Sequence, residues 1–271
     1  MLGRKAVTLF FAAIWAVVVV APLYYMLVVS VQNPSSFMSD NPWLPSGPLT
    51  LENYGAVVEG GFAAHLLNTL VVATGATALS VVVSLFAAYA IVVRASKTTR
   101  FIFQAFLIGF AIPIQALMIP LYIMIVEAQL YDSLLGLILP MAAFSLPITI
   151  LILVNFFREV PLSLISAMQL DGAGPVRILR SLAVPICIPA IITVSILDFI
   201  NAWNNFLFPL LLTQSPEKAT LPLSVFNFQG NNFSNVPLIM AAVALSTLPL
   251  LVAYVLARRQ ITNGLAAGFG S

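Results

Sequence analysis

Six long apolar segments, separated by short polar stretches, constrain the fold of this 271-residue chain more than any other feature. A transmembrane helix needs about 20 mostly apolar residues, and six segments meet this requirement: 8–30, 67–93, 101–126, 133–157, 186–212 and 236–257. Hydrophobic residues make up 61% of the chain and charged residues 7%, against about 45–50% and about 25% in soluble domains. The sequence therefore predicts an all-α polytopic membrane protein with six transmembrane helices, formed by a single domain over residues 1–271.

The basic residues predict how these helices are oriented, because cytoplasmic loops of membrane proteins carry an excess of Lys and Arg. If the N-terminus is cytoplasmic and the chain crosses six times, Lys218 is the only basic residue outside. The other ten lie inside: Arg4, Lys5, Arg94, Lys97, Arg100, Arg158, Arg177, Arg180, Arg258 and Arg259. We therefore expect both termini and the loop 158–185 to be cytoplasmic.

Residue types that carry catalysis or bind metals are scarce in this chain. It has one cysteine, Cys187, and one histidine, His65, and it has no G-x-x-x-x-G-K-[ST] phosphate-binding loop. We therefore expect no catalytic residue, no metal site and no cofactor bound by the chain itself. Energy for transport has to come from a partner protein or from an ion gradient.

The loop 158–185 has the sequence signals of two short helices joined by a turn. Pro161 and Pro175 are each suited to the first position of a helix, and Gly172 is suited to a left-handed C-cap. Apolar residues share one face of each helix: Leu164, Ile165 and Met168 in the first, and Ile178, Leu179 and Leu182 in the second. From the residues alone, two interpretations stay open, since such a face suits either the membrane surface or a partner protein.

Residues 166–173, with the sequence SAMQLDGA, resemble the EAA loop of bacterial binding-protein-dependent ABC importers. The core of that loop reads Glu-Ala-Ala, two further residues, then Asp-Gly-Ala. Ser166 stands in place of the Glu and Met168 in place of the second Ala. The matching residues are Ala167, Asp171, Gly172 and Ala173.

Further patterns, in the same order along nearly the whole chain, resemble the carbohydrate branch of that family, the maltose-type inner-membrane permeases. They are Asn53-Tyr54, Asn68-Thr69, Ala87-Ala88-Tyr89-Ala90, Ile119-Pro120-Leu121-Tyr122, Val160-Pro161, Phe199 with Trp203-Asn204, and Gly264-Leu265. On this basis, the chain resembles a permease subunit of a sugar importer in the bacterial inner membrane.

The resemblance implies a set of partners and roles. The chain would form half of a pore with a second homologous permease subunit, and an extracytoplasmic sugar-binding protein would deliver the sugar. A dimeric cytoplasmic ATPase would bind ATP and Mg and would hold the loop in a cleft. The residues implied in this coupling are Ser166, Ala167, Met168, Asp171, Gly172 and Ala173. Membrane lipid is the remaining expected partner, and no nucleic acid is expected.

Polar residues in the fifth apolar segment are the candidates for a substrate pathway. Asp198, Asn201, Asn204 and Asn205 are expected on one sector of a helix, and asparagine offers sugars both hydrogen-bond donors and acceptors. Two alternatives stay open. These residues are also suited to bonding between neighbouring helices, and Asp198 is suited to being the ion site of an ion-coupled secondary transporter, since an ionised Asp within a span is costly and normally functional.

Overall fold

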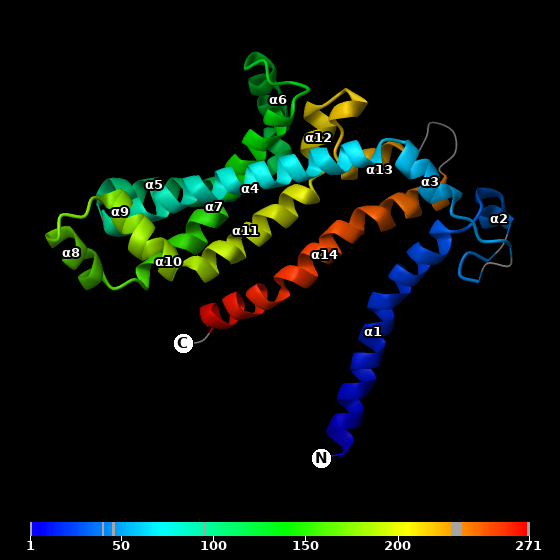
Figure 1. The fold of residues 1–271 in the computed structure, drawn as a ribbon, viewed down its shortest axis with the longest axis horizontal. Coiled ribbons are helices and arrows are strands. Elements are labelled where there is room, and N and C mark those ends of the chain that lie inside the picture. Colours follow the sequence, from blue (N-terminus) through cyan, green and yellow to red (C-terminus); the bar gives the residue numbers. More distant parts are fainter. Residues whose placement is uncertain (1, 40, 45–46, 95, 229–234, 270–271) are drawn as a thin grey trace. The chain divides into compact units, whose positions relative to one another are not determined.

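The computed structural model describes residues 2–39, 41–44, 47–94, 96–228 and 235–269, and the regular secondary structure in these ranges is helical (Figure 1). The four longest helices are α1 (Leu2–Ser30), α4 (Phe62–Val93), α7 (Leu134–Arg158) and α14 (Val236–Phe269). The shorter ones are α2 (Pro34–Ser39), α3 (Glu52–Glu59), α5 (Lys97–Phe110), α6 (Met118–Glu127), α8 (Leu162–Leu170), α9 (Pro175–Ile178), α10 (Val184–Ile186), α11 (Ile188–Trp203), α12 (Leu207–Leu212) and α13 (Leu221–Asn227). The segments η1 (Ile114–Leu117) and η3 (Pro216–Lys218) are short 3₁₀ helices, and η2 (Leu179–Ala183) is a short π-helix.

The predicted all-α membrane fold is confirmed, although not every span is one straight helix. By length and composition, three described helices can cross a membrane: Val7–Ser30, Phe62–Val93 and Leu134–Arg158. Two more candidates are bent pairs, Lys97–Phe110 with Ile114–Glu127 at 97° and Pro175–Ile186 with Ile188–Trp203 at 82°. The sixth predicted segment falls on α14, whose apolar part is the shorter stretch Val236–Val252.

The predicted span 101–126 is interrupted in the structure, because the chain leaves the helix between Phe110 and Ile114. Pro113 has an extended backbone, with φ −61° and ψ 128°. A proline has no N–H to donate, and it disfavours the helical conformation at the residue before it. The local sequence thus ends α5 and allows η1 and α6 to continue in another direction.

The predicted span 186–212 is interrupted as well, since α11 ends at Trp203 and α12 begins at Leu207. The side-chain oxygen of Asn205 accepts a hydrogen bond from the backbone N–H of Phe208 at 3.0 Å. This bond satisfies one of the N–H groups that the start of a helix leaves without an intrahelical acceptor. Asn205 therefore initiates α12 instead of extending α11.

The chain forms two compact units, Met1–Leu66 with Leu221–Val252, and Leu67–Thr220 with Ala253–Ser271. In the first unit, Val57, Ala241 and Ala242 are buried. The side-chain amide of the buried Asn53 donates to the carbonyls of Ser30 and Gln32, both at 2.9 Å, and the hydroxyl of Tyr54 lies 2.7 Å from that of Ser30. The Asn-Tyr pattern thus fastens α3 to the end of α1.

The second unit is built around α7, which packs against both α5 and α11. Its core combines residues of α4, α7 and α11 with residues of the loop that follows α7. The fully buried members are Ala88, Ile150, Leu153, Val154, Ile178, Ala183, Cys187, Ala190 and Val194. The loop after α7 is therefore a fixed part of this core.

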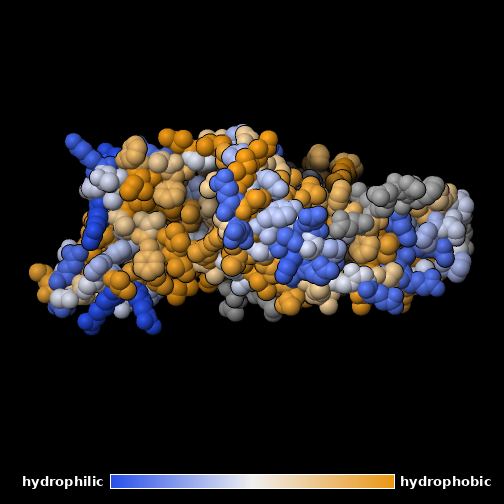
Figure 2. Space-filling view, turned by 90° about the horizontal axis from the view of Figure 1, so that it is seen from above, coloured by the Kyte–Doolittle hydropathy of each residue, from blue (hydrophilic) through white to orange (hydrophobic). Residues whose placement is uncertain are grey.

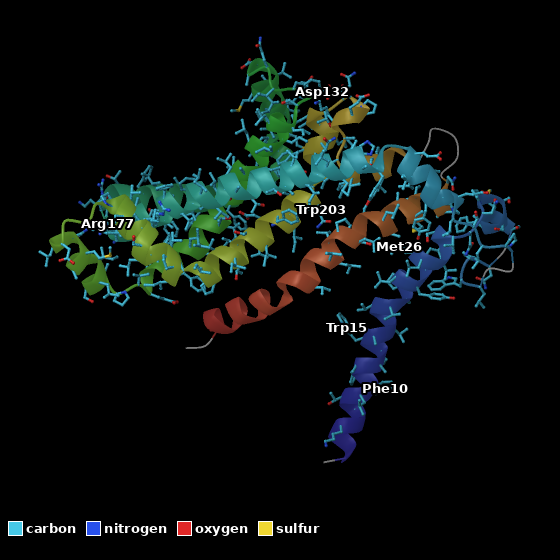
Figure 3. All side chains as sticks on the ribbon, in the orientation of Figure 1. Phe10, Trp15, Met26, Asp132, Arg177 and Trp203 are labelled. Atoms are coloured by element: carbon cyan, nitrogen blue, oxygen red, sulfur yellow. The ribbon has the colours of Figure 1, made fainter. Side chains whose placement is uncertain are left out.

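Asp132 joins the α6–α7 turn to the end of α12 (Figure 3). Its N–H donates to the carbonyl of Leu212 at 2.9 Å, and its Oδ1 accepts from the N–H groups of Gln214 at 2.9 Å and Ser215 at 3.0 Å. The Ser215 hydroxyl donates to Oδ2. These hydrogen bonds lower the pKa of the Asp132 carboxyl below its usual range. The bond from the Ser215 hydroxyl contributes most, followed by those from the two backbone amides.

We expect Asp132→Asn to lower thermal stability at neutral pH by an amount on the order of 1 kcal/mol, because bonds to a charged carboxylate are lost from a partly exposed turn. Asparagine tolerates the left-handed backbone of this residue, whose φ is +54°, so the variant isolates the charge. Because the pKa of Asp132 is lower in the folded state, the ionised carboxylate stabilises the fold at pH values above its unfolded pKa of about 3.9. This stabilisation is lost as the pH falls through the lowered pKa of the folded state. Unfolding in detergent from about pH 7 to about pH 3 should therefore show the difference between the two proteins shrinking at the acid end. A constant difference would contradict this role.

Candidate functional site

The loop after α7 folds as the two short helices that its prolines predict. Helix α7 ends at Arg158, and Pro161 immediately precedes α8 as its N-cap residue. Pro175 is the first residue of α9. The pair of helices is continuous with η2 and α10, which lead into α11.

Gly172 ends α8 in the left-handed conformation expected for it, with a φ of +79°. The N–H of Gly172 donates to the carbonyl of Gln169 at 3.0 Å, and the N–H of Ala173 donates to that of Met168 at 2.9 Å. These are the two bonds of a Schellman motif, which usually also brings together the apolar residues on either side of the turn. Met168 and Ala173 both pack against the core of the second unit. The Asp-Gly-Ala sequence therefore sets the angle at which the chain leaves α8.

Burial divides the loop into an inner and an outer side. Ile165, Ile178 and Leu179 are buried in the core. Leu164 is 46% exposed, whereas Met168 is half-buried. The three residues predicted to share one apolar face of the first helix are therefore divided between the core and the outside, because α8 packs along one narrow stripe. The outer side carries further exposed apolar residues, among them Leu170 at 90%. The large apolar residues exposed on α8 and α9 are Leu162, Leu164, Leu170 and Val176, and we refer to this set as the outer apolar face.

The six residues implied in coupling fall on both sides of the loop. Ser166, Ala167, Asp171 and Gly172 are exposed. Met168 and Ala173 are half-buried against the core. Arg177 on α9 (Figure 3) and Arg180 on η2 are also exposed. Figure 2 shows hydrophilic side chains at the end of the molecule where α8 and α9 lie, followed by a largely hydrophobic surface.

The structure does not place the four polar residues of 198–205 on one common sector. Asp198 is 2% exposed, and the hydroxyl of Thr149 on α7 lies 3.1 and 3.0 Å from its two carboxylate oxygens. Asn201 and Asn204 are exposed, and the Asn204 amide donates to the carbonyl of Ile200 at 2.9 Å. Asn205 lies beyond the end of α11, and its side chain accepts a hydrogen bond from the Phe208 N–H in the first turn of α12. These positions separate one buried acid from two exposed amides.

Asp198 belongs to a buried polar cluster between three helices. Ser145 of α7 and Ser80 of α4 lie near its carboxylate, although the Ser80 hydroxyl has no hydrogen-bond partner of good geometry. Thr77 and Ser84 of α4 carry further buried hydroxyls on the same stretch. The α4 residues of this cluster were not predicted from the sequence. Their signal is the spacing of residues 77, 80 and 84, which puts three hydroxyls on one face of α4.

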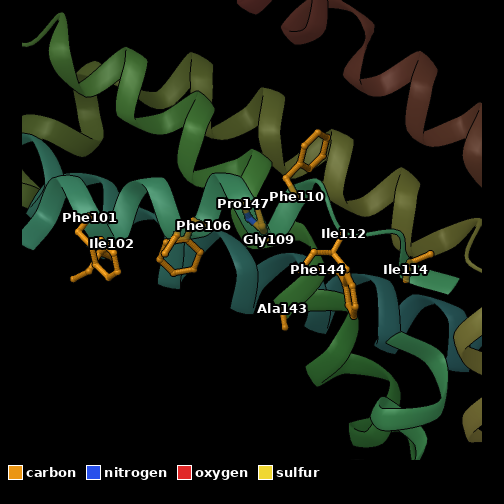
Figure 4. Close-up of a pocket in the computed structure, with 11 residues that line it drawn as sticks. Phe101, Ile102, Phe106, Gly109, Phe110, Ile112, Ile114, Ala143, Phe144 and Pro147 are labelled. Atoms are coloured by element: carbon orange, nitrogen blue, oxygen red, sulfur yellow. The ribbon is translucent and has the colours of Figure 1, made fainter. Parts of the chain in front are cut away.

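A second feature of this unit is a pocket of about 640 Å³ at the break between α5 and η1. It is lined by apolar residues of α5, the break and α7, including Phe101, Phe106, Phe110 and Phe144 (Figure 4). Such a lining offers hydrocarbon contacts and few hydrogen-bonding groups, so it does not have the dense polar lining that a sugar requires.

Comparison with known proteins shows the family to which this chain is similar. Residues 80–264 match the family described as binding-protein-dependent transport system inner membrane component. A putative ABC transporter permease protein from Caldicellulosiruptor sp. is 37% identical, over 95% of this chain and 94% of that protein. The trehalose transport system permease SugB of Mycobacterium tuberculosis is 33% identical, over 91% and 90% of the two chains.

A solved structure shows the same fold. It is a crystal structure of a bacterial ABC transporter involved in the import of the acidic polysaccharide alginate, and it superposes with a TM-score of 0.79 at 21% identity. The match covers 94% of this chain and 95% of the other. Because a family match over most of the chain and relatives of similar length agree, the chain belongs to the family of inner membrane components of binding-protein-dependent transport systems, the permeases of ABC importers.

Proposed function

We propose that this permease imports a sugar, driven by ATP hydrolysis on a separate dimeric ATPase whose cleft receives α8 and α9. The observation that carries the proposal is the outer apolar face, defined above, whose residues belong to the short helices α8 and α9 between α7 and α11. An exposed apolar face of this kind suits the membrane surface or a partner protein, and membership of a family of transport-system components favours the protein. ATP and Mg would be bound by the ATPase, and this chain would contribute no catalytic residue and bind no metal.

The proposed roles of the six loop residues follow from their exposure. Ser166, Ala167, Asp171 and Gly172 would contact the ATPase, since they are exposed. Met168 and Ala173 would transmit its movement, since they pack against the core of α4, α7 and α11. A rigid connection of this kind supports coupling, because packed elements move together.

A sugar is the proposed substrate because relatives of similar length carry sugar names. One is SugB, described above, and another is the trehalose/maltose transport system permease MalG of Thermococcus litoralis, 31% identical over 95% of this chain. Asn201 and Asn204 are the proposed substrate-pathway residues, because exposed amides within a span favour a water-filled interior. A second homologous permease subunit would complete the pore, and an extracytoplasmic binding protein would supply the sugar.

The alternative, an ion-coupled transporter that uses Asp198, has no support from the relatives. The surroundings of Asp198 also favour packing over ion exchange, since its carboxylate is buried against the Thr149 hydroxyl of the same chain. We therefore propose a structural role between helices for Asp198. The alternative for this residue is the substrate-pathway role predicted from the sequence.

The proposed orientation, in a bacterial inner membrane with both termini cytoplasmic, can be tested with single cysteines at Thr98 and Glu217, which are both exposed. We expect an impermeant thiol reagent added outside intact cells to label Glu217→Cys and to leave Thr98→Cys unlabelled. The native Cys187 is 1% exposed and should give little background. Labelling of Thr98→Cys alone would reverse the assignment.

The same chemistry tests the contact with the ATPase. A cysteine at Leu170, the most exposed residue of the outer apolar face, should react in inside-out vesicles that lack the ATPase and be protected in vesicles that contain it. Thr98→Cys serves as the control for access to that side of the membrane. Equal reactivity of Leu170→Cys with and without the ATPase would mean that α8 does not enter its cleft.

A further inference from the structure

A second pocket of the Leu67–Thr220 unit lies where four helices end or begin. It has a volume of about 540 Å³. Its lining comes from the end of α4, the start of α5, the end of α7 and the start of α8, including Ile91, Lys97, Arg100, Phe103, Arg158 and Leu162. The pocket therefore sits at the ends of three apolar segments and next to the loop of α8 and α9.

Three cationic side chains line this pocket without a carboxylate partner. Within the ranges that the structure describes, Lys97, Arg100 and Arg158 take part in no ion pair. The Arg158 guanidinium lies 5.9 Å from the centre of the Phe103 ring, within the range of a cation–π contact. The ring thus helps to orient Arg158 while leaving its N–H donors available.

The start of α5 adds a further positive contribution. Ser96 and Thr99 cap the helix reciprocally, with Ser96 Oγ accepting from the Thr99 N–H at 3.1 Å and Thr99 Oγ1 accepting from the Ser96 N–H at 3.0 Å. The next free amides of the first turn, those of Lys97 and Thr98, have no carbonyl acceptor within a helix. The N-terminal end of a helix favours an anion, here beside three cations.

The other half of the lining is apolar. Ile91 and Phe103 are half-buried, and Leu162 is 62% exposed. A free inorganic anion gains nothing from such a wall, whereas a phospholipid has a charged phosphate joined to glycerol and acyl chains. Basic pockets between membrane helices on the cytoplasmic side suit anionic headgroups, and the basic residues predict that this side is cytoplasmic.

From these observations we propose that the pocket formed by Lys97, Arg100, Arg158 and the apolar residues beside them binds the headgroup of an anionic phospholipid. A lipid in this place contacts the ends of α4 and α7 and the starts of α5 and α8. It thereby fixes the base of the α8–α9 loop. The proposal depends on the membrane fold alone, and it holds or fails independently of the sugar and of the ATPase.

Lipid binding to the full chain can be measured by native mass spectrometry from detergent, with phosphatidylglycerol and with phosphatidylcholine of the same acyl chains. We expect phosphatidylglycerol to bind preferentially. Each basic residue near an anionic membrane surface contributes about a fivefold gain in affinity, so Arg100→Gln/Arg158→Gln should weaken phosphatidylglycerol binding about 25-fold. Arg100→Lys/Arg158→Lys, which keeps both charges, should retain most of it.

The matched control is Arg177→Gln/Arg180→Gln, which removes two exposed charges of the neighbouring α9 region outside the pocket. The proposal predicts little change in phosphatidylglycerol binding for this variant. An equal loss in both Gln variants would show attraction to the whole basic surface and would overturn a specific site.

Two further outcomes would also overturn the proposal. Displacement of phosphatidylglycerol by glycerol phosphate at equal concentration would assign the pocket to soluble phosphate compounds. Unchanged lipid binding in Arg100→Gln/Arg158→Gln, together with loss of association with the ATPase, would assign it to an acidic segment of that protein.

Discussion

Gly172→Val is expected to leave the chain in the membrane at near-normal levels and to reduce sugar uptake about tenfold or more. Gly172 has a φ of +79° and terminates α8, and a left-handed backbone costs other residues roughly 1–2 kcal/mol, more for a β-branched one. A side chain added here meets no atom of this chain within 4 Å. The substitution therefore acts through backbone strain at the turn between α8 and α9, and not through a steric collision.

Gly174 provides the matched control two residues further on. An added Cβ there also meets nothing within 4 Å, and its backbone is extended, with φ −72° and ψ 164°. Gly174→Val should therefore cost much less uptake than Gly172→Val. Membrane levels from immunoblots and binding-protein-stimulated ATP hydrolysis complete the measurement. Full uptake by Gly172→Val would mean that the loop is a plain connector.

Asp198→Leu is expected to produce the largest loss of stability, since it removes the acceptor of a buried polar cluster. Thr149 is 1% exposed, and its hydroxyl would lose the carboxylate and keep only the Ser145 carbonyl, at 3.0 Å, as an acceptor. A lost hydrogen bond to a charged group costs about 1.5–3 kcal/mol, so the variant should accumulate poorly and unfold at a lower temperature in detergent. Fluorescence-detected size-exclusion chromatography after heating measures both effects.

Two companion variants separate packing from ion coupling at Asp198. Asp198→Asn keeps an acceptor for Thr149 and should retain stability and measurable uptake. Asp198→Leu/Thr149→Val removes both partners and should recover part of the lost stability, because replacing both groups by apolar ones can be nearly neutral. Normal stability of Asp198→Asn with a complete loss of uptake would instead identify Asp198 as an ion site.

Features that depend on local sequence were predictable, and Gly172 is the clearest example. A glycine after a short helix predicts a left-handed C-cap, and the observed φ and the two Schellman bonds confirm it. Pro175 at the first position of α9 follows from the same kind of local rule. The length and apolar character of 67–93 and 133–157 likewise matched α4 and α7 closely.

The breaks in the spans depend on more than local sequence. Pro113 stands in a break, whereas Pro140 and Pro147 lie inside the continuous helix α7. A proline in an apolar segment therefore indicates either a break or a tolerated kink, and surrounding contacts decide between them. At the end of α11 the deciding contact is the hydrogen bond from the Phe208 N–H to the Asn205 side chain. From the sequence alone, Asn205 cannot be distinguished from any other polar residue within a span.

The burial of Asp198 was not predictable for a related reason. Helical periodicity places Asp198, Asn201 and Asn205 on neighbouring parts of one face, but it does not say where α7 and α4 pack. In the structure, Thr149 and Ser80 come from helices far away in sequence. Only tertiary packing separates the buried acid from the exposed amides.

The central claim, that this permease couples sugar import to a partner ATPase, is tested most directly by uptake into proteoliposomes. The complete complex would be reconstituted with binding protein outside, and uptake of a labelled trehalose or maltose-type sugar would be followed with and without ATP inside. We predict that uptake requires internal ATP and external binding protein, and that a proton or sodium gradient does not replace ATP. Gradient-driven uptake without internal ATP would contradict the claim.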